Sequence, residues 1–218
     1  MLPSRGIQSF NAPIDISHSI EWMNTFGEAV LRIGIAMLQG ARSEHAQALL
    51  QVDSEIEIVE LRRPSDLLLG IDALILPGGE STSMRLASAS KGLLKSLFDW
   101  MIENKDKPVL GTCAGAILLC QPEFELTPFV DAMISRNSFG RQSDSFQAKL
   151  KVRIIEESEF SGVFIRAPRF IENGCQAVAW LGDEVVGILD GNRMALTFHP
   201  ELTDDLLFHR WLITQASA

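Results

Sequence analysis

The chain has 218 residues, of which 46% are hydrophobic, and its mean hydropathy is +0.13. A chain of this length and composition can bury a full core and form one domain, or one domain with a small lobe, which excludes an intrinsically disordered protein. It carries 19 Lys and Arg residues against 28 Asp and Glu, a net charge of −9. That balance argues against binding to nucleic acid or to an anionic membrane surface.

The apolar segments are too short to cross a membrane. The longest, residues 109–120, is interrupted by glycines and falls well below the roughly 18 residues that a span needs. No unbroken apolar block follows Arg5, so we expect no secretory signal. The three cysteines form no C-x-x-C pair, so we expect neither a disulfide framework nor a cysteine zinc site, and a reducing cytoplasm is the expected compartment.

Residues 1–30 show neither helical nor strand periodicity, and we expect an N-terminal extension before a domain at 31–218. From residue 31 strands and helices alternate. The predicted order is strand 31–37, helix 43–50, strand 55–61, strand 73–76, helix 91–104 and strand 108–110. Short apolar strands between helices indicate an α/β protein with a parallel sheet covered on both faces.

The second half of the chain is richer in strands. After a short helix at 116–120, which Pro122 ends, strands are predicted at 146–155, 162–165, 176–180, 184–189 and 193–198. Gly182-Asp183 and Gly191-Asn192 are typical of hairpin turns, so an antiparallel portion joins the parallel sheet. Thr203 is the predicted N-cap of a closing helix that runs to about residue 214.

The most informative segment is Gly111-Thr112-Cys113-Ala114-Gly115, which lies between an apolar strand and a helix. This pattern is typical of a nucleophile elbow with sulfur in place of oxygen. The glycines leave room where the sharp turn crowds the backbone on both sides of the nucleophile. Cys113 would lie at a helix N-terminus, where the dipole favours a thiolate. The alternative is a small buried cysteine in a glycine-rich turn.

A base for this nucleophile is offered by Phe198-His199-Pro200-Glu201, between an apolar strand and the closing helix. In an extended segment residues two apart point to one side, so the Glu201 carboxylate can orient the His199 imidazole. The position also suits the carboxyl end of a strand, where α/β proteins build sites. The other histidines, His18, His45 and His209, have no comparable setting. The alternative is a surface histidine beside an acidic capping turn.

A third signal is the buried strand that ends in Pro77-Gly78-Gly79-Glu80-Ser81. Paired glycines let main-chain N–H groups approach a ligand closely, as an oxyanion hole requires. The alternative is a tight turn with Ser81 as N-cap. No Walker A, H-E-x-x-H or EF-hand spacing occurs in the sequence, so we expect no metal and no cofactor.

With these motifs assembled, the sequence resembles the class I (triad) glutamine amidotransferases and, among them, the glutaminase subunits of pyridoxal 5′-phosphate synthase. The resemblance covers about residues 31–216. G-x-C-x-G and H-P-E would be shared by the wider class. The vitamin B6 branch is indicated by L-Q-G at 38–40, P-G-G-E-S-T at 77–82, R-N-S-F-G-R-Q at 136–142 and I-R-A-P at 165–168.

The resemblance implies a three-layer flavodoxin-like α/β fold with a mostly parallel central sheet and an added antiparallel portion. It implies Cys113 as the nucleophile, His199 as general base and acid, and Glu201 as the residue that orients His199. In the reaction that these roles predict, main-chain N–H groups of Gly79 and Ala114 form the oxyanion hole. The glutamine-binding positions carried over from the family are Gly79, Glu80, Ser81, Arg136, Ile165 and Arg166.

The implied reaction is the hydrolysis of L-glutamine to L-glutamate and ammonia. The ammonia would pass, within a cytoplasmic hetero-oligomeric complex, to a separate synthase subunit that combines it with ribose 5-phosphate and glyceraldehyde 3-phosphate. Two segments depart from the family pattern. Residues 1–30 are either a mis-assigned start upstream of Met23 or a lineage-specific addition, and residues 121–128 differ from the expected loop.

Three other functions remain open at this point. A glutaminase that serves histidine or purine synthesis would keep the triad but should lack the R-N-S-F-G-R-Q string. A stand-alone cysteine hydrolase or chaperone of the related α/β class would keep the elbow cysteine without H-P-E. A structural partner that has lost activity is disfavoured by the complete triad.

Overall fold

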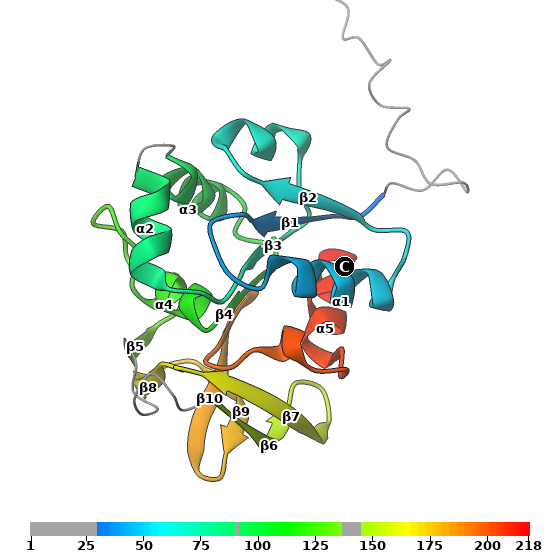
Figure 1. Cartoon of the computed structure of the whole chain (residues 1–218), viewed down its shortest axis with the longest axis vertical. Helices are drawn as coiled ribbons and strands as arrows, with labels where there is room; N and C mark the ends of the chain where they lie inside the picture. Colours follow the sequence, from blue (N-terminus) through cyan, green and yellow to red (C-terminus); the bar gives the residue numbers. More distant parts are fainter. Residues whose placement is uncertain (1–29, 90–91, 137–144) are drawn as a thin grey trace, which may run out of the picture. The chain divides into compact units, whose positions relative to one another are not determined.

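The computed structural model describes residues 30–89, 92–136 and 145–218 (Figure 1). The chain divides into two units, Met1–Val30 and Leu31–Ala218, and the elements below all belong to the second. Apart from Val30, the predicted extension lies outside the described residues, as do residues 137–142 of the R-N-S-F-G-R-Q string. Within the described ranges, no helix has the length and apolar character needed to cross a membrane.

Parallel strands form one half of the main sheet in the second unit. Its strands lie in the order β2-β1-β3-β4-β11. Their bounds are β1 (Arg32–Ala36), β2 (Glu57–Leu61), β3 (Ala73–Leu76), β4 (Val109–Thr112) and β11 (Arg193–Leu196). Each lies within or close to a predicted strand, so the parallel core that the sequence indicates is confirmed.

The antiparallel half of the sheet continues from β11 in the order β10-β9-β6-β7. Its strands are β6 (Ser145–Arg153), β7 (Glu157–Ile165), β9 (Gln176–Leu181) and β10 (Glu184–Asp190). The two predicted hairpin turns connect β9 to β10 and β10 to β11, and Gly182 and Gly191 adopt positive φ there (59° and 57°). Strand β11 pairs with β4 on one side and β10 on the other, so it joins the two halves.

Helices cover both faces of the parallel half-sheet (Figure 1). Helices α2 (Ser81–Ala89), α3 (Leu93–Glu103) and α4 (Ala114–Cys120) cover one face, and α1 (Arg42–Val52) and α5 (Leu207–Ala216) cover the other. Alternate residues of β3 enter the two resulting cores: Leu74 and Leu76 pack in the core of α3, and Ala73 and Ile75 in that of α5. A strand buried on both faces is therefore apolar throughout, as its sequence indicates.

Two further strands escaped the sequence analysis. β5 (Ala132–Ser135) and β8 (Arg169–Asn173) form a small antiparallel sheet of their own. Both are short and half exposed, with Met133 and Ile171 turned to solvent, so they lack the apolar run that marks a buried strand. Strand β7 also begins five residues before its predicted start, because its polar first residues lie on the edge of the sheet.

The predicted N-cap of the closing helix is wrong. Helix α5 begins at Leu207, whose N–H donates to the Asp205 side chain at 3.0 Å. The Thr203 hydroxyl instead donates to the carbonyl of Pro200 at 3.0 Å and closes a short 3-10 turn, η3 (Pro200–Leu202). The sequence His199-Pro200-Glu201 therefore forms a separate turn before the helix, and Glu201 lies on that turn.

The atypical loop after α4 is held against neighbouring elements. Arg85 of α2 donates to the carbonyl of Gln121 at 2.6 Å. The ring of Phe98 in α3 contacts those of Phe124 and Phe129, with centroids 6.3 and 5.2 Å apart. These contacts connect the loop to the helices that lie behind the nucleophile elbow. A further 3-10 turn, η2 (Pro64–Leu69), connects β2 to β3.

Candidate active site

The nucleophile elbow forms as its glycines predict. Cys113 lies between β4 and α4 with φ 48° and ψ −102°, a conformation that non-glycine residues rarely adopt. A β-carbon at Gly115 would lie 1.9 Å from the carbonyl oxygen of Leu76, and one at Gly111 would lie 2.8 Å from the carbonyl carbon of Gly115. Both positions therefore require glycine. The Cys113 residue is 5% exposed.

His199 reaches the elbow because β11 pairs with β4. Leu196 is in register with Thr112, so the two strands end together, and Cys113 and His199 follow from the same edge of the sheet. The backbone N–H of His199 donates to the carbonyl of Val163 in β7 at 2.8 Å. The neighbouring Phe198 is fully buried. His199 itself is 6% exposed, which excludes the alternative of a surface histidine.

His199 and Glu201 form a hydrogen-bonded pair beside Cys113. Nδ1 of His199 lies 2.8 Å from Oε1 of Glu201, which leaves Nε2 for the thiol of Cys113. Burial disfavours the charged imidazole, but hydrogen bonds to Cys113 and Glu201 and their negative charges outweigh it and raise the pKa of His199 to about 10. At neutral pH the His199 ring is therefore charged, which suits it to donate a proton.

Glu201 stays ionised although it is buried. Burial alone would raise the pKa of this carboxyl group, but the neighbouring His45 and the hydrogen bond from His199 hold the pKa of Glu201 below its ordinary value. A charged carboxylate at Nδ1 fixes the tautomer and the orientation of the His199 ring. The pair has the chemistry of a base and the group that orients it.

The Gly78-Gly79 segment follows β3 and lies against the other two parts of the site. A β-carbon at Gly78 would lie 2.3 Å from Cε1 of His199, so the imidazole occupies the space that a side chain would fill. On the other side, a β-carbon at Gly40 would lie 1.5 Å from the carbonyl oxygen of Gly78. The loop after β1 and the loop after β3 therefore touch through their backbones.

The start of α2 differs from the alternative in which Ser81 is the N-cap. The Glu80 carboxylate accepts the backbone N–H groups of Thr82 and Ser83 at 2.9 and 2.7 Å, and the Ser83 hydroxyl as well. These hydrogen bonds, that of the Ser83 hydroxyl foremost, lower the pKa of Glu80 to about 2. Glu80 therefore caps the helix in place of Ser81. The buried Ser81 hydroxyl has no hydrogen-bond partner among the described residues.

A pocket opens beside Cys113. It has a cavity volume of about 40 Å³, which is below the range for small-molecule sites. Its lining contains all six residues that the sequence assigned to glutamine binding, together with Cys113 and Ile117: Gly79, Glu80, Ser81, Arg136, Ile165 and Arg166. Sequence analysis did not single out Ile117, one turn along α4 from the nucleophile.

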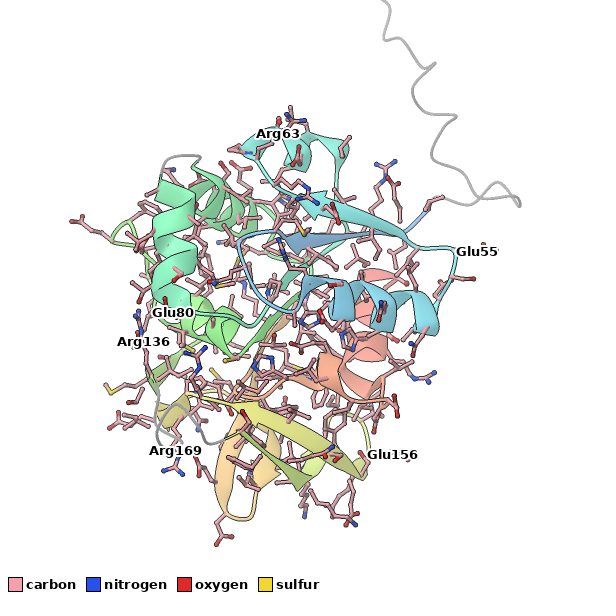
Figure 2. All side chains as sticks on the ribbon, in the orientation of Figure 1. Glu55, Arg63, Glu80, Arg136, Glu156 and Arg169 are labelled. Carbon is pink, nitrogen blue, oxygen red and sulfur yellow. The ribbon has the colours of Figure 1, made fainter. Side chains whose placement is uncertain are left out.

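Side chains on two sides of this pocket are held in place. Figure 2 shows Glu80 and Arg136 beside the start of α2, and Nη1 of Arg136 lies 3.2 Å from the Thr82 hydroxyl. On another side, the carbonyl oxygen of Ile165 lies 3.9 Å from the Cys113 sulfur. The next residue, Arg166, adopts a left-handed conformation with φ 46°. The lining of the pocket therefore combines the thiol of Cys113 with two arginines.

Two histidines that the sequence analysis set aside also lie at this site. His45 and His209 are fully buried, and Nε2 of His45 lies 3.4 Å from Oε2 of Glu201. His209 lies on the face of α5 that also buries Phe208, Trp211 and Leu212. A histidine on an apolar helix face was the available signal. His18 lies outside the described residues.

Comparisons with known proteins identify the family of this chain. The family model described as "SNO glutamine amidotransferase family" matches residues 35–218. A protein of Thermococcus onnurineus (strain NA1), "Pyridoxal 5′-phosphate synthase subunit PdxT", is 41% identical over 201 residues, covering 86% of this chain and 100% of the relative. A protein of the same name from Shouchella clausii (strain KSM-K16) is 41% identical over 189 residues, covering 84% and 94%. A crystal structure titled "Crystal structure of glutamine amidotransferase" matches with a TM-score of 0.73 and 37% identity, covering 85% of this chain and 99% of the other.

Proposed function

Because the chain belongs to the SNO glutamine amidotransferase family, we propose that it is the glutaminase subunit of a pyridoxal 5′-phosphate synthase. Its site would hydrolyse the side-chain amide of L-glutamine. The observation that carries the proposal is the grouping of Cys113, His199 and Glu201 beside a pocket lined by the six residues that the resemblance assigns to glutamine binding. A thiolate beside an imidazolium is suited to attack on an amide carbon.

In the first half of the reaction, the Cys113 thiolate attacks the side-chain amide carbon of glutamine. Negative charge develops on the amide oxygen, and the N–H groups of Gly79 and Ala114 donate hydrogen bonds to this oxygen. His199 gives its proton to the amide nitrogen, the C–N bond breaks, and ammonia leaves. A γ-glutamyl thioester and a neutral imidazole remain.

In the second half, neutral His199 takes a proton from water, and the water oxygen attacks the thioester carbon. The C–S bond breaks, the thiolate is restored beside the imidazolium, and the new carboxyl group gives its proton to solution. Glu201 keeps the His199 ring in the orientation that both halves need. Neither half requires a metal or a cofactor.

Substrate orientation is assigned to the remaining pocket residues. In this proposal Arg136 and Arg166 pair with the α-carboxylate of glutamine, since guanidinium groups bind carboxylates with two parallel hydrogen bonds. The Ser81 hydroxyl, buried and without a partner among the described residues, is suited to bind a polar group of the ligand. Glu80 supports this site by fixing the start of α2.

The partner in this proposal is the synthase subunit that consumes the ammonia in a hetero-oligomeric complex. The support is the printed name of the relatives, "Pyridoxal 5′-phosphate synthase subunit PdxT", at about 40% identity. We expect the complex to work in the cytoplasm, because a thiolate nucleophile and two further free thiols, Cys120 and Cys175, fit a reducing compartment.

The test measures glutamate formation and pyridoxal 5′-phosphate formation from ribose 5-phosphate and glyceraldehyde 3-phosphate in the presence of the synthase subunit. With glutamine as nitrogen source, wild type should support both and Cys113→Ala neither. With an ammonium salt, Cys113→Ala should support pyridoxal 5′-phosphate formation as well as wild type does. Glutamate formation by Cys113→Ala at the wild-type rate, or none by wild type with the synthase present, would refute the proposal.

A further inference from the structure

A second group of buried polar side chains lies behind the triad. His45 of α1 and His209 of α5 are both 0% exposed, and Nδ1 of His45 lies 2.9 Å from Nε2 of His209. On its other side, Nε2 of His45 lies 3.3 Å from the hydroxyl of Thr112, the residue before the nucleophile. Polar groups buried this deeply cost free energy unless they are paired, so the arrangement needs an explanation.

The group faces an oxygen of the Glu201 carboxylate that has no short hydrogen bond among the described residues. Oε1 of Glu201 is bound to His199, whereas Oε2 is buried and receives no hydrogen bond of good geometry from the described residues. Nε2 of His45 lies 3.4 Å from this oxygen. An N–H at that nitrogen would be shared between Oε2 of Glu201 and the Thr112 hydroxyl.

The positions of the protons follow from charge and burial. Burial outweighs the attraction of Glu201 and lowers the pKa of His45, and it lowers the pKa of His209 to about 3, so each ring is neutral and carries one N–H. If the proton of His45 were on Nδ1, a nitrogen lone pair would face the carboxylate. With the proton on Nε2, His45 donates to Glu201 and its Nδ1 accepts from His209.

The far end of His209 agrees with this assignment. If Nε2 of His209 donates to His45, Nδ1 carries no proton. Nδ1 is buried and has no partner among the described residues, and a bare acceptor is tolerated there more readily than an unpaired N–H. A metal does not join the two rings, since their nitrogens are at hydrogen-bond distance and no metal-binding group of three or more ligands occurs in the described ranges.

We propose that His45 is a positioning residue of the triad, whose Nε2–H holds the second oxygen of Glu201, and that His209 fixes the tautomer of His45. The proposal rests on the proposed function of the triad. It gives the Glu201 carboxylate a contact on each side, so that its first oxygen stays directed at His199. It also connects helices α1 and α5 to the turn that carries Glu201.

The kinetic test compares three variants in glutaminase assays with the synthase subunit present. His45→Leu removes the donor and replaces the ring with an apolar side chain of similar size. His45→Gln keeps an N–H that is as many bonds from the backbone as Nε2 of histidine. Ser88→Ala is the control, because its buried hydroxyl accepts from the Leu94 N–H at 2.6 Å, far from the triad along the chain.

We expect His45→Leu to lower kcat by about ten- to a hundred-fold, the effect of one lost hydrogen bond to a charged group, with little change in KM. His45→Gln should recover most of this loss, and Ser88→Ala should lower the melting temperature without lowering kcat. A His45→Leu enzyme with wild-type kcat, or a His45→Gln enzyme as impaired as His45→Leu, would overturn the proposal.

The pH profile separates positioning from a general loss of stability. The groups that face Glu201 are His199 on its own segment, His45 from α1 and His209 from α5, with Cys113 beyond His199 and Glu44 beside His45. Without the donor from His45, Glu201 takes up a proton more readily. The acid limb of kcat/KM should therefore move to higher pH by about one unit in His45→Leu and stay in place in Ser88→Ala. An unmoved limb in His45→Leu contradicts the proposal.

A spectroscopic measurement tests the proton positions without reference to turnover. The sequence has four histidines, so their ring nitrogens can be assigned in ¹⁵N-labelled protein by single substitutions. We expect both His45 and His209 to be neutral at pH 7 and protonated on Nε2. A proton on Nδ1 of His45 would refute the proposal even if His45→Leu failed to fold. A wild-type enzyme without glutaminase activity would instead refute the proposed function. The ¹⁵N measurement would still test the proton positions of His45 and His209.

Discussion

Gly78 and His199 are so close that a β-carbon at position 78 would lie 2.3 Å from Cε1 and 2.8 Å from Nδ1 of the imidazole. The imidazole of His199 therefore packs directly against the backbone of Gly78. Nδ1 is also the atom that binds Glu201, so any displacement of the ring disturbs this hydrogen bond. The absence of a side chain at Gly78 is a condition for the triad geometry.

We predict that Gly78→Ala lowers glutaminase kcat by about a hundred-fold or more, because reacting groups displaced by about 1 Å lose rate on that scale. Gly174→Ala is the matched control. Its β-carbon would meet only the flexible carboxylate of Asp131, at 2.7 Å, and we expect near-normal turnover. Circular dichroism should show both variants folded. Unchanged kcat in Gly78→Ala would contradict the arrangement of loop and imidazole.

The three cysteines should differ sharply in reactivity. Burial raises the pKa of Cys120 to about 12, and burial followed by the charge of Asp190 raises that of Cys175 to about 11, so both stay as thiols at neutral pH. A glutamine analogue with an electrophilic side chain should therefore label Cys113, as read by peptide mass spectrometry. Cys120→Ala should be labelled as fast as wild type and Cys113→Ala hardly at all. Predominant labelling of Cys120 or Cys175 would refute the nucleophile assignment.

We expect the oxyanion hole to depend on the partner through Gly79. A β-carbon there would find only ordinary contacts, at 3.6 Å from Gln39 and Gly40, so a substitution acts on backbone freedom more than on packing. Hydrolysis without the synthase should be low and should rise on its addition, because one oxyanion donor is worth about a hundred- to a thousand-fold.

Gly79→Val should lose more of this activation than of glutamine binding, which is measured by calorimetry on the Cys113→Ala background. Equal turnover with and without the synthase at saturating glutamine would reject the gating and leave the triad assignment in place.

The buried histidines should make the protein sensitive to mild acid. His209 has a pKa of about 3 in the folded state and about 6.5 when unfolded, so between these values unfolding takes up a proton. The stabilising contribution is present above about pH 6.5. It falls as pH decreases, by about 1.4 kcal/mol per pH unit for this one group.

Urea unfolding between pH 7 and 5 measures this slope. His209→Gln should flatten it by about one proton, and Ser88→Ala should lower stability with the wild-type slope. An identical pH slope in His209→Gln and wild type would show that His209 is not held neutral.

We predict that the N-terminal extension is dispensable for catalysis. The family match begins at residue 35, and the first described strand begins at Arg32. A shortened chain that begins at Met23 should keep synthase-activated turnover near the full-length value. The comparison needs equal melting temperatures for the two chains. A large loss of turnover at equal stability would place part of the extension in the site or at the interface.

Much of the local structure could be predicted from the sequence. The strand β3 was predicted with its observed bounds, since four apolar residues before Pro77 and two glycines define it locally. The elbow at Cys113 followed from Gly111 and Gly115, because a turn this sharp admits no β-carbon at either place. Such features depend on residues that are neighbours along the chain, and their conformational limits are visible in the sequence.

The sequence could not decide which distant elements meet. Cys113 and His199 come together only because β11, which pairs with β10 of the antiparallel half-sheet, also pairs with β4, in register at Leu196 and Thr112. Periodicity indicates that each strand is buried, but not which strand lies beside it. The motifs suggested a base for the nucleophile, and the strand pairing determined that it reaches the elbow.

The sequence alone therefore determined the apolar strands, the glycine turns and the candidate nucleophile with its base. It is the packing of the whole domain that buries His45 and His209, from helices at opposite ends of the domain sequence, behind Glu201. Their burial is a property of apolar helix faces, but their partners are set by how α1 and α5 pack on the same face of the sheet. A hydrogen bond between side chains depends on positions within a few tenths of an ångström, and residue types alone do not fix that geometry.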